Sequence, residues 1–180
     1  TAAKSTQSEA GATGHGFKEY LFLLHLGDKI YGGLEHISST ALLAGRNSLP
    51  AYGMNDAGDD YTQLLGLFSH EYFHAWNVKS IKPAAFVPYR LDSESYTEQL
   101  WAFEGITSYY DDLFLVQSGV IGTEAYLKLL AKALTRVQQN PGRLKQTLAE
   151  SSFTAWHKFY KQEENSPNAI ESYYKKGALA

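Results

Sequence analysis

Two spacings of hydrophobic residues divide the chain. Near its beginning, Tyr20 to Leu26 is a short apolar run of strand length, Gly27-Asp28 is typical of a turn, and Ile30-Tyr31 restarts the extended pattern. From about residue 59 onwards, hydrophobic residues recur every three or four positions, which indicates helices. The pattern predicts an α+β fold, with a small mixed or antiparallel sheet in the first 40 residues and a mostly helical remainder.

The helical part has recognisable starts and stops. Residues 41–58 are rich in Gly and small residues and are expected to form a loop. The helix expected from Thr123 to Asn140 carries a hydrophobic stripe that we expect to lie in the core. Helices are expected from about residue 59 to before Pro83, from a capping box at Ser95 and Glu98 to Gly119, from Thr123 to Asn140, over residues 150–160, and from about Ala169.

The chain ends suggest a domain with flanking or missing parts. Residues 1–16 are rich in Ala, Gly, Ser and Thr without periodicity, which is typical of a flexible tail or linker. Residues 17–180 are long enough for one domain with a core. Residues 173–180 begin a helix that has no capping residue at its end, so we expect this domain to be truncated at its C-terminus.

Composition excludes several classes of function. The net charge is −3 and the basic residues are scattered, so nucleic acid is not an expected partner. No apolar run approaches the roughly 18 residues of a membrane span, so we expect a soluble chain, with the cytoplasm favoured over the periplasm. Cysteine is absent, which leaves His and carboxylate side chains as metal donors. Oligomeric state is left open.

The segment from His70 to His74 has the sequence HEYFH and fits the zinc-peptidase pattern H-E-x-x-H. Residues four apart on a helix differ by about 40° of rotation and about 6 Å of rise, so both imidazoles would face one metal ion. Glu71 is turned by about 100° from His70, which suits a general base acting on water. The alternative is a chance occurrence of two core histidines and a surface glutamate. We expect one Zn²⁺ per chain.

A catalytic zinc needs a third protein ligand. Glu94 and Glu104 both lie at a suitable distance after His74. Glu94 falls near a helix start, where a solvated carboxylate is ordinary. Glu104 lies among Trp101, Phe103 and Ile106, where an unpaired carboxylate is costly unless it binds a cation. Glu104 is therefore the predicted ligand, and its neighbour Gly105 is expected to let this helix pack closely against the motif helix.

Two further acidic positions are candidates for supporting roles. Asp111 lies seven residues after Glu104, on the same helix face, where it would hydrogen-bond a ligand histidine or else remain a surface acid. Gly32 and Gly33 precede Glu35 in an extended segment, and glycine in a strand often marks the close approach of another chain. A peptide substrate would be such a chain, and a bulge with a solvated Glu35 is the alternative.

These motifs together resemble a family. HEYFHAWN followed by WAFEGITSYY resembles the gluzincin metallopeptidases, in which H-E-x-x-H is completed by the Glu of an E-G-x-T-x-Y helix. With YGGLEH and SYYKKGALA added, the chain from about Phe17 onwards is similar to the bacterial glycyl aminopeptidases, relatives of aminopeptidase N that often carry a PDZ domain. The resemblance implies a thermolysin-like catalytic core.

The same resemblance implies roles for individual residues. It places zinc on His70, His74 and Glu104 and makes Glu71 the general base. Gly33-Leu34-Glu35-His36 is similar to the G-x-M-E-N strand of aminopeptidase N relatives, in which Glu binds the free amine of the substrate, but Leu and His replace Met and Asn. Tyr174-Lys175-Lys176-Gly177 matches the Y-x-K-G segment of the same relatives, in which the Tyr stabilises the oxyanion. Tyr173 is the alternative candidate for this role.

The implied function is zinc-dependent removal of an N-terminal residue from peptides, with a preference for small residues such as Gly. The residues leave two alternatives open, a zinc endopeptidase and a non-catalytic peptide-binding module with the same fold. The interval between His74 and Glu104 is longer than in aminopeptidase N relatives, and substrate preference is expected to depend on the loop from Pro83 to Asp92.

Overall fold

The computed structural model describes residues 17–53 and 58–180, so the tail expected at residues 1–16 lies outside the described residues. The chain forms two compact units. The first comprises the described residues up to Ser80 together with Asp111–Thr123, and the second comprises Ile81–Tyr110 and Glu124–Ala180. Each unit is described separately.

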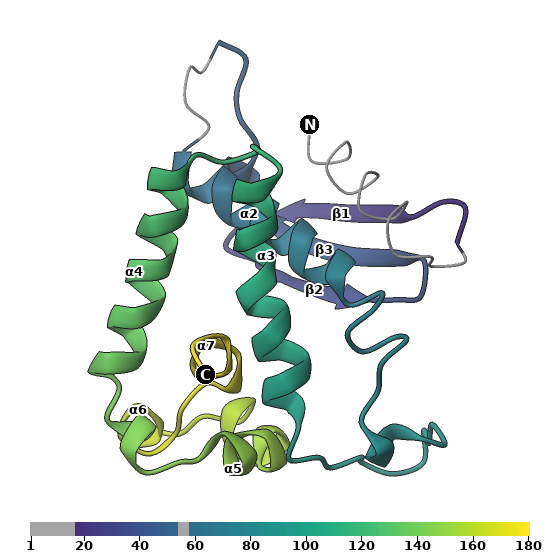
Figure 1. Ribbon diagram of the computed structural model, residues 1–180, viewed down its shortest axis with the longest axis vertical. Coiled ribbons are helices and arrows are strands. Elements are labelled where there is room, and N and C mark those ends of the chain that lie inside the picture. The colour runs from purple at the N-terminus through teal and green to yellow at the C-terminus, as the bar shows by residue number, and fades with distance from the viewer. Residues whose placement is uncertain (1–16, 54–57) are drawn as a thin grey trace. The chain divides into compact units, whose positions relative to one another are not determined.

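A three-stranded mixed sheet opens the first unit, with β1 (Leu21–Gly27) and β2 (Gly32–Glu35) on either side of β3 (Ser39–Gly45). β1 is parallel and β2 antiparallel to β3 (Figure 1). The expectation of a loop from residue 41 is wrong, because β3 continues to Gly45 and forms the middle strand. A short turn over residues 36–38, closed by the bond from the His36 N–H to the Ser39 carbonyl, separates β2 from β3.

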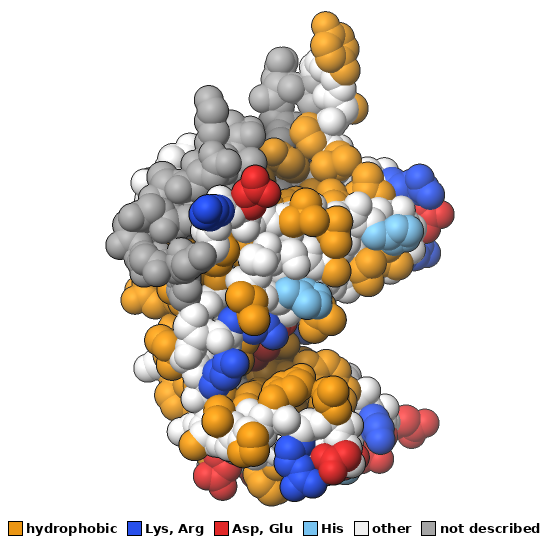
Figure 2. Space-filling view, turned by 90° about the vertical axis from the view of Figure 1, so that its right-hand side faces the viewer, with side chains coloured by type: hydrophobic (Ala, Val, Ile, Leu, Met, Phe, Trp, Pro, Cys, Tyr) orange, Lys and Arg blue, Asp and Glu red, His pale blue; other side chains and the backbone are white. Residues whose placement is uncertain are grey.

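Helix α2 (Gly58–Phe73) covers one face of this sheet. Alternate residues of β3 are buried, and Leu42 and Ala44 form the core of the first unit with Leu64 and Leu67 of α2. The opposite face keeps Leu21, Leu23 and Leu43 about half exposed, and Figure 2 shows hydrophobic side chains spread widely over the face that it draws. The core therefore fixes α2, and with it the HEYFH segment, against the sheet.

The next long helix begins later than the capping box predicts. Residues 95–97 are not helical, and the side chain of Thr97, not Ser95, accepts a hydrogen bond from a backbone N–H, that of Gln99. A π-helical turn over Trp101–Gly105 leads without a break into α3 (Ile106–Gln117). The N–H of Trp101 donates to the Ser152 hydroxyl at 3.0 Å, which anchors the start of this turn.

The remaining helices are α4 (Thr123–Gln139), α5 (Leu148–Phe153), α6 (Ser166–Ala169) and α7 (Tyr173–Ala178). The bounds expected for the helix at residue 123 are confirmed, but its hydrophobic stripe is not core. All of α4 is described and none of its residues is buried, with Leu127 54% exposed. A π-helical turn over Ala155–Phe159 follows α5, and Ala169 ends α6 where a helix start was expected.

The α+β fold predicted from the sequence is confirmed, with a small sheet followed by helices. In the part of the chain that the structure describes, no helix is both long enough and apolar enough to span a lipid bilayer.

Candidate active site

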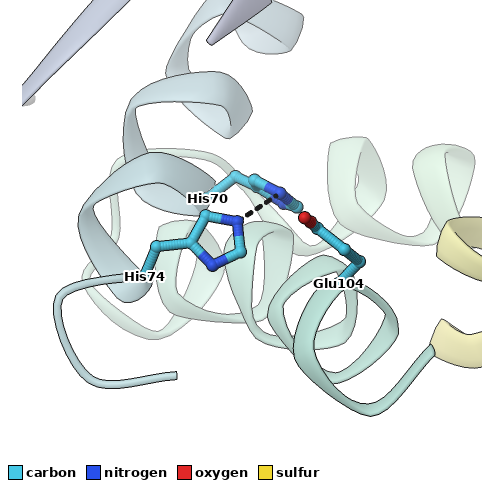
Figure 3. A group of neighbouring side chains, drawn as sticks. All are labelled: His70, His74 and Glu104. Atoms are coloured by element: carbon cyan, nitrogen blue, oxygen red, sulfur yellow. Dashed lines mark hydrogen bonds between the residues drawn. The ribbon is translucent and has the colours of Figure 1, made fainter. Parts of the chain in front are cut away.

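His70 and His74 lie at the C-terminal end of α2, as the sequence predicts. The bond from the His74 N–H to the His70 carbonyl, at 3.3 Å, continues the helical geometry through the last residue of the motif. The two imidazole rings stand nearly perpendicular, and their Nε2 atoms face each other 3.2 Å apart (Figure 3). His74 is 2% exposed. The helix thus directs both Nε2 atoms at one point.

The hydrogen bonds of the two Nδ1 atoms indicate which nitrogen of each imidazole carries a proton. His70 Nδ1 lies 3.1 Å from Asp111 Oδ2, and His74 Nδ1 lies 2.8 Å from the Asn77 carbonyl oxygen. A carboxylate and a carbonyl only accept hydrogen bonds, so each Nδ1 carries the proton and donates. When both rings are neutral, each Nε2 presents a lone pair toward the other, an arrangement that a shared cation would stabilise.

Zinc fits this pair of donors. Two nitrogens bound to zinc at about 2.0–2.1 Å in tetrahedral geometry lie about 3.3–3.4 Å apart, which is close to the observed 3.2 Å. The Asp111 carboxylate is itself held, because its Oδ1 accepts a hydrogen bond from the Asp112 N–H at 2.6 Å. The hydrogen bond between Asp111 and a histidine of the motif is therefore observed as the sequence suggested, and it fixes the orientation of His70.

Glu71 is enclosed by the edge strand of the sheet. Its side chain is buried, and a Cβ atom added to Gly33 of β2 would lie about 2.1 Å from Glu71 Oε1. The glycine backbone therefore touches the carboxylate directly, and any larger residue would displace it. No described atom lies within 4 Å of a Cβ added to Gly32, so only Gly33 has this constraint.

Glu35, at the end of β2, lies in the same part of the first unit. Ligand atoms of Glu35, Glu71 and His74 all lie within 4.8 Å of one another. The Glu35 carboxylate forms an ion pair with Lys79, whose Nζ lies 3.0 Å from Oε1. Lys79 is not among the residues predicted from the sequence. Its distance from the motif, five residues after His74, carries no periodic signal, and only the folded backbone brings it to the strand.

Glu104 comes from the π-helical turn that precedes α3. Asp111 follows it by seven residues, about two helical turns, along the same uninterrupted helical stretch. His70, His74 and Glu104, drawn in Figure 3, form a second set of described side chains whose ligand atoms all lie within 4.8 Å of one another. π-helical turns are rare and frequently occur at functional sites.

Tyr174 lies in the first turn of α7, which the Ser172 side chain caps. Its hydroxyl is 3.3 Å from that of Tyr160, which also lies 2.9 Å from the Tyr173 hydroxyl. Burial is the largest cause that raises the pKa of Tyr174 far above its ordinary value, and the negative charge of the Glu104 carboxylate is the second. The Tyr174 hydroxyl therefore keeps its proton. Tyr160 is a second residue that sequence analysis missed, because no motif includes it.

Gly105 has a different partner from the one expected. A Cβ added to it would lie about 2.6 Å from the backbone of Gly177 in α7, not against the motif helix. Gly177 in turn faces the Trp101 carbonyl, where an added Cβ would be 2.9 Å away. This close contact of two glycines packs α7 against the turn that carries Glu104, which brings Tyr174 near that carboxylate. The glycine of α2 nearest α3 is Gly66, beside Asp112.

A small sheet and a helix that ends in H-E-x-x-H, with its two imidazoles directed at one point, define the class of H-E-x-x-H peptidases. Comparison with family models gives the family. The model of the M61 glycyl aminopeptidases matches residues 63–180, and the chain belongs to this family.

A solved structure supports the same assignment. The chain is 49% identical to an aminopeptidase N family protein from Idiomarina loihiensis, with a TM-score of 0.92 over 99% of this chain. The match covers 30% of the Idiomarina chain, so the present chain spans less than a third of that protein's length. Comparison with curated proteins gives no match. The resemblance to glycyl aminopeptidases seen in the sequence is confirmed.

Proposed function

We propose that this chain carries the catalytic centre of a zinc-dependent aminopeptidase, which removes small N-terminal residues such as Gly from peptides. The observation that carries the proposal is the pair of Nε2 atoms of His70 and His74, which face each other 3.2 Å apart with both Nδ1 atoms engaged as donors. Membership of the M61 glycyl aminopeptidase family supports the reaction class and the preference for Gly.

His70, His74 and Glu104 would hold the metal. Three protein ligands with one position left open is the arrangement of catalytic zinc sites. Asp111 accepts the His70 Nδ1 proton, and the Asn77 carbonyl accepts that of His74, so both rings are oriented before the metal binds. When bound, zinc polarises the scissile carbonyl group and makes water a stronger acid.

Glu71 is the proposed general base. It accepts a proton from the attacking water and later donates a proton to the leaving amine. A carboxylate oxygen of Glu71 lies within 4.8 Å of the ligand atoms of His74 and Glu35. The backbone of Gly33 limits the movement of this carboxylate. The close fit at Gly33 supports this role, because a base must be held within hydrogen-bonding distance of the water.

Tyr174 is the proposed hydrogen-bond donor to the oxyanion. A donor must retain its proton during the reaction, and the raised pKa of Tyr174 meets this requirement across the neutral range. Tyr173 is the less suitable candidate, since its side chain is almost completely buried and its hydroxyl lies closer to that of Tyr160, at 2.9 Å against 3.3 Å for Tyr174. We therefore retain packing as the role of Tyr173.

Glu35 is the proposed binding residue for the α-ammonium group of the substrate, beside Gly32 and Gly33 of β2. A carboxylate here would fix the free N-terminus and restrict cleavage to the first peptide bond. The ion pair of Glu35 with the Lys79 ammonium supports this role, because the carboxylate already accepts a cation of the same chemical type.

The test is hydrolysis of aminoacyl reporter substrates by the full-length, zinc-loaded protein, with Glu71→Gln as the matched variant. The proposal predicts turnover of glycyl and alanyl reporters and a loss of about 10²-fold or more in kcat for Glu71→Gln. Equal turnover by the two proteins would contradict it. Equal cleavage of N-acetylated and free peptides would favour an endopeptidase, and peptide binding unaffected by Glu35→Ala and Glu71→Gln would favour a binding module.

A further inference from the structure

Lys79 is fixed to the end of the motif helix by its backbone. Its N–H donates to the His74 carbonyl at 2.9 Å, and the Ser80 N–H donates to the Trp76 carbonyl at 3.2 Å. The Ser80 hydroxyl adds a bond to the Ala75 carbonyl at 2.9 Å. The segment after the motif thus folds back on the helix end, and the position of Lys79 is determined by the same residues that position His74.

The Lys79 side chain reaches across to the edge strand. Its Nζ lies 3.0 Å from Glu35 Oε1, and the two side chains are 28% and 21% exposed. Ion pairs at fully exposed positions contribute little because water screens them, but this pair is largely shielded. Lys79 therefore connects the helix that carries the metal motif to the strand that carries the proposed amine-binding carboxylate.

Glu35 has a neighbour of like charge that makes such a connection necessary. Ligand atoms of Glu35 and Glu71 lie within 4.8 Å of each other. Two carboxylates at this distance repel each other in a partly buried site, and without a counter-charge the more mobile one turns toward solvent. The Lys79 ammonium supplies that counter-charge through one oxygen. A carboxylate offers about four acceptor positions, so the second oxygen remains available.

We propose that Lys79 is a positioning residue for substrate recognition, which holds Glu35 beside Glu71 through Oε1 so that the other oxygen binds the substrate's α-ammonium. This inference rests on the proposed aminopeptidase function and extends it to a residue outside the motifs. Lys79 touches neither the reacting atoms nor the metal ligands' donor atoms, so it affects how tightly a free amine binds and not the chemical step.

The experiment compares Lys79→Met and Lys79→Arg in the full-length, zinc-loaded protein, using free and N-acetylated glycyl reporters. For Lys79→Met we expect KM for the free-amine reporter to rise about 10-fold or more, the loss of one charge-assisted hydrogen bond, with kcat within about twofold. Lys79→Arg should restore most of the affinity. Lys82→Met, at an exposed position three residues away, is the matched control and should leave both constants unchanged.

Two additional measurements separate positioning from other effects. In a Glu35→Gln background, Lys79→Met should not raise KM further, because both changes remove the same interaction. A crystal structure of Lys79→Met should show the Glu35 carboxylate turned away from Glu71. An unchanged or lowered KM, an additive effect in the Glu35→Gln background, or an unmoved Glu35 would each overturn the inference. If the unaltered protein cleaves no aminoacyl reporter, the proposed function itself fails.

Discussion

The Nε2 atoms of His70 and His74 face each other across 3.2 Å, and in the neutral rings neither Nε2 carries a proton, because each ring donates from Nδ1. Two lone pairs directed at one point repel unless a cation lies between them or one ring takes up a second proton. The geometry of the helix end is therefore compatible with a bound cation.

The Asp111 carboxylate should contribute to metal affinity through His70. Asp111→Ala removes the acceptor of the Nδ1 proton, which leaves the ring free to rotate and makes Nε2 a weaker ligand. We expect zinc affinity to fall about 10- to 100-fold, measured by competition with a chelator. Asp28→Ala, which removes an exposed acid paired with Arg46, is the control. Equal zinc affinity for both variants would contradict this role.

Gly33 should be required for the position of the general base. In Gly33→Ala the added methyl group overlaps the Glu71 carboxylate, which must move by about 1 Å or more. A displacement of this size lowers kcat by about 10²-fold. Zinc binding should persist, because the three atoms nearest the added methyl group all belong to Glu71 and not to a proposed zinc ligand. Steady-state kinetics and zinc content measure the two effects.

Gly122→Ala provides a comparison, since no described atom lies within 4 Å of its added Cβ. It should retain full activity. If Gly33→Ala were equally active, the close contact between β2 and Glu71 would have no catalytic consequence.

Tyr160 should act through Tyr174. Tyr160→Phe removes the hydroxyl that lies within hydrogen-bonding distance of both Tyr173 and Tyr174. The loss of one such bond, about 1 kcal/mol, should lower kcat about 5-fold with little change in KM. Tyr174→Phe should lower kcat by about 10²-fold or more.

The fully exposed Tyr52 supplies the control, and Tyr52→Phe should match the unaltered protein. A Tyr160→Phe variant that changes KM alone would show that Tyr160 contacts substrate and does not position Tyr174.

Gly105 should be required for the stability of the second unit. In Gly105→Ala the new methyl group would lie about 2.6 Å from the Gly177 backbone, which has no flexible side chain to move aside. Overpacking of this kind costs about 1–3 kcal/mol in the free energy of unfolding. Thermal unfolding should show a lower melting temperature than Gly122→Ala, and an equal melting temperature would contradict the close packing of α7.

The sequence predicted the structure best where regular apolar spacing or a known motif was present. α2 and α4 have regular apolar spacing, and the start of α2 and both bounds of α4 were predicted closely, although α2 already ends at Phe73. The H-E-x-x-H motif fixed the relative directions of His70 and His74. β3 was missed beyond residue 40, because nearby Gly and Pro residues resemble those of a loop. The stripe of α4 was assigned to the core because periodicity shows which face is apolar but not whether anything covers it.

Contacts between distant segments could not be predicted. The ion pair of Lys79 with Glu35 joins residues 44 positions apart in sequence, and neither residue type indicates the other. The partner of Gly105 was misassigned for a related reason. A glycine in a helix indicates close approach, but several elements could have approached it, and α7 does.

Catalysis in the proposed mechanism depends on one zinc ion bound to His70, His74 and Glu104. Crystals of the full-length protein, measured on both sides of the zinc absorption edge, test it most directly. We expect one anomalous peak per chain, about 2.0–2.2 Å from both Nε2 atoms and from the Glu104 carboxylate. A protein without such a peak, or an ion bound to the histidines while Glu104 turns away from it, would contradict the proposed zinc site.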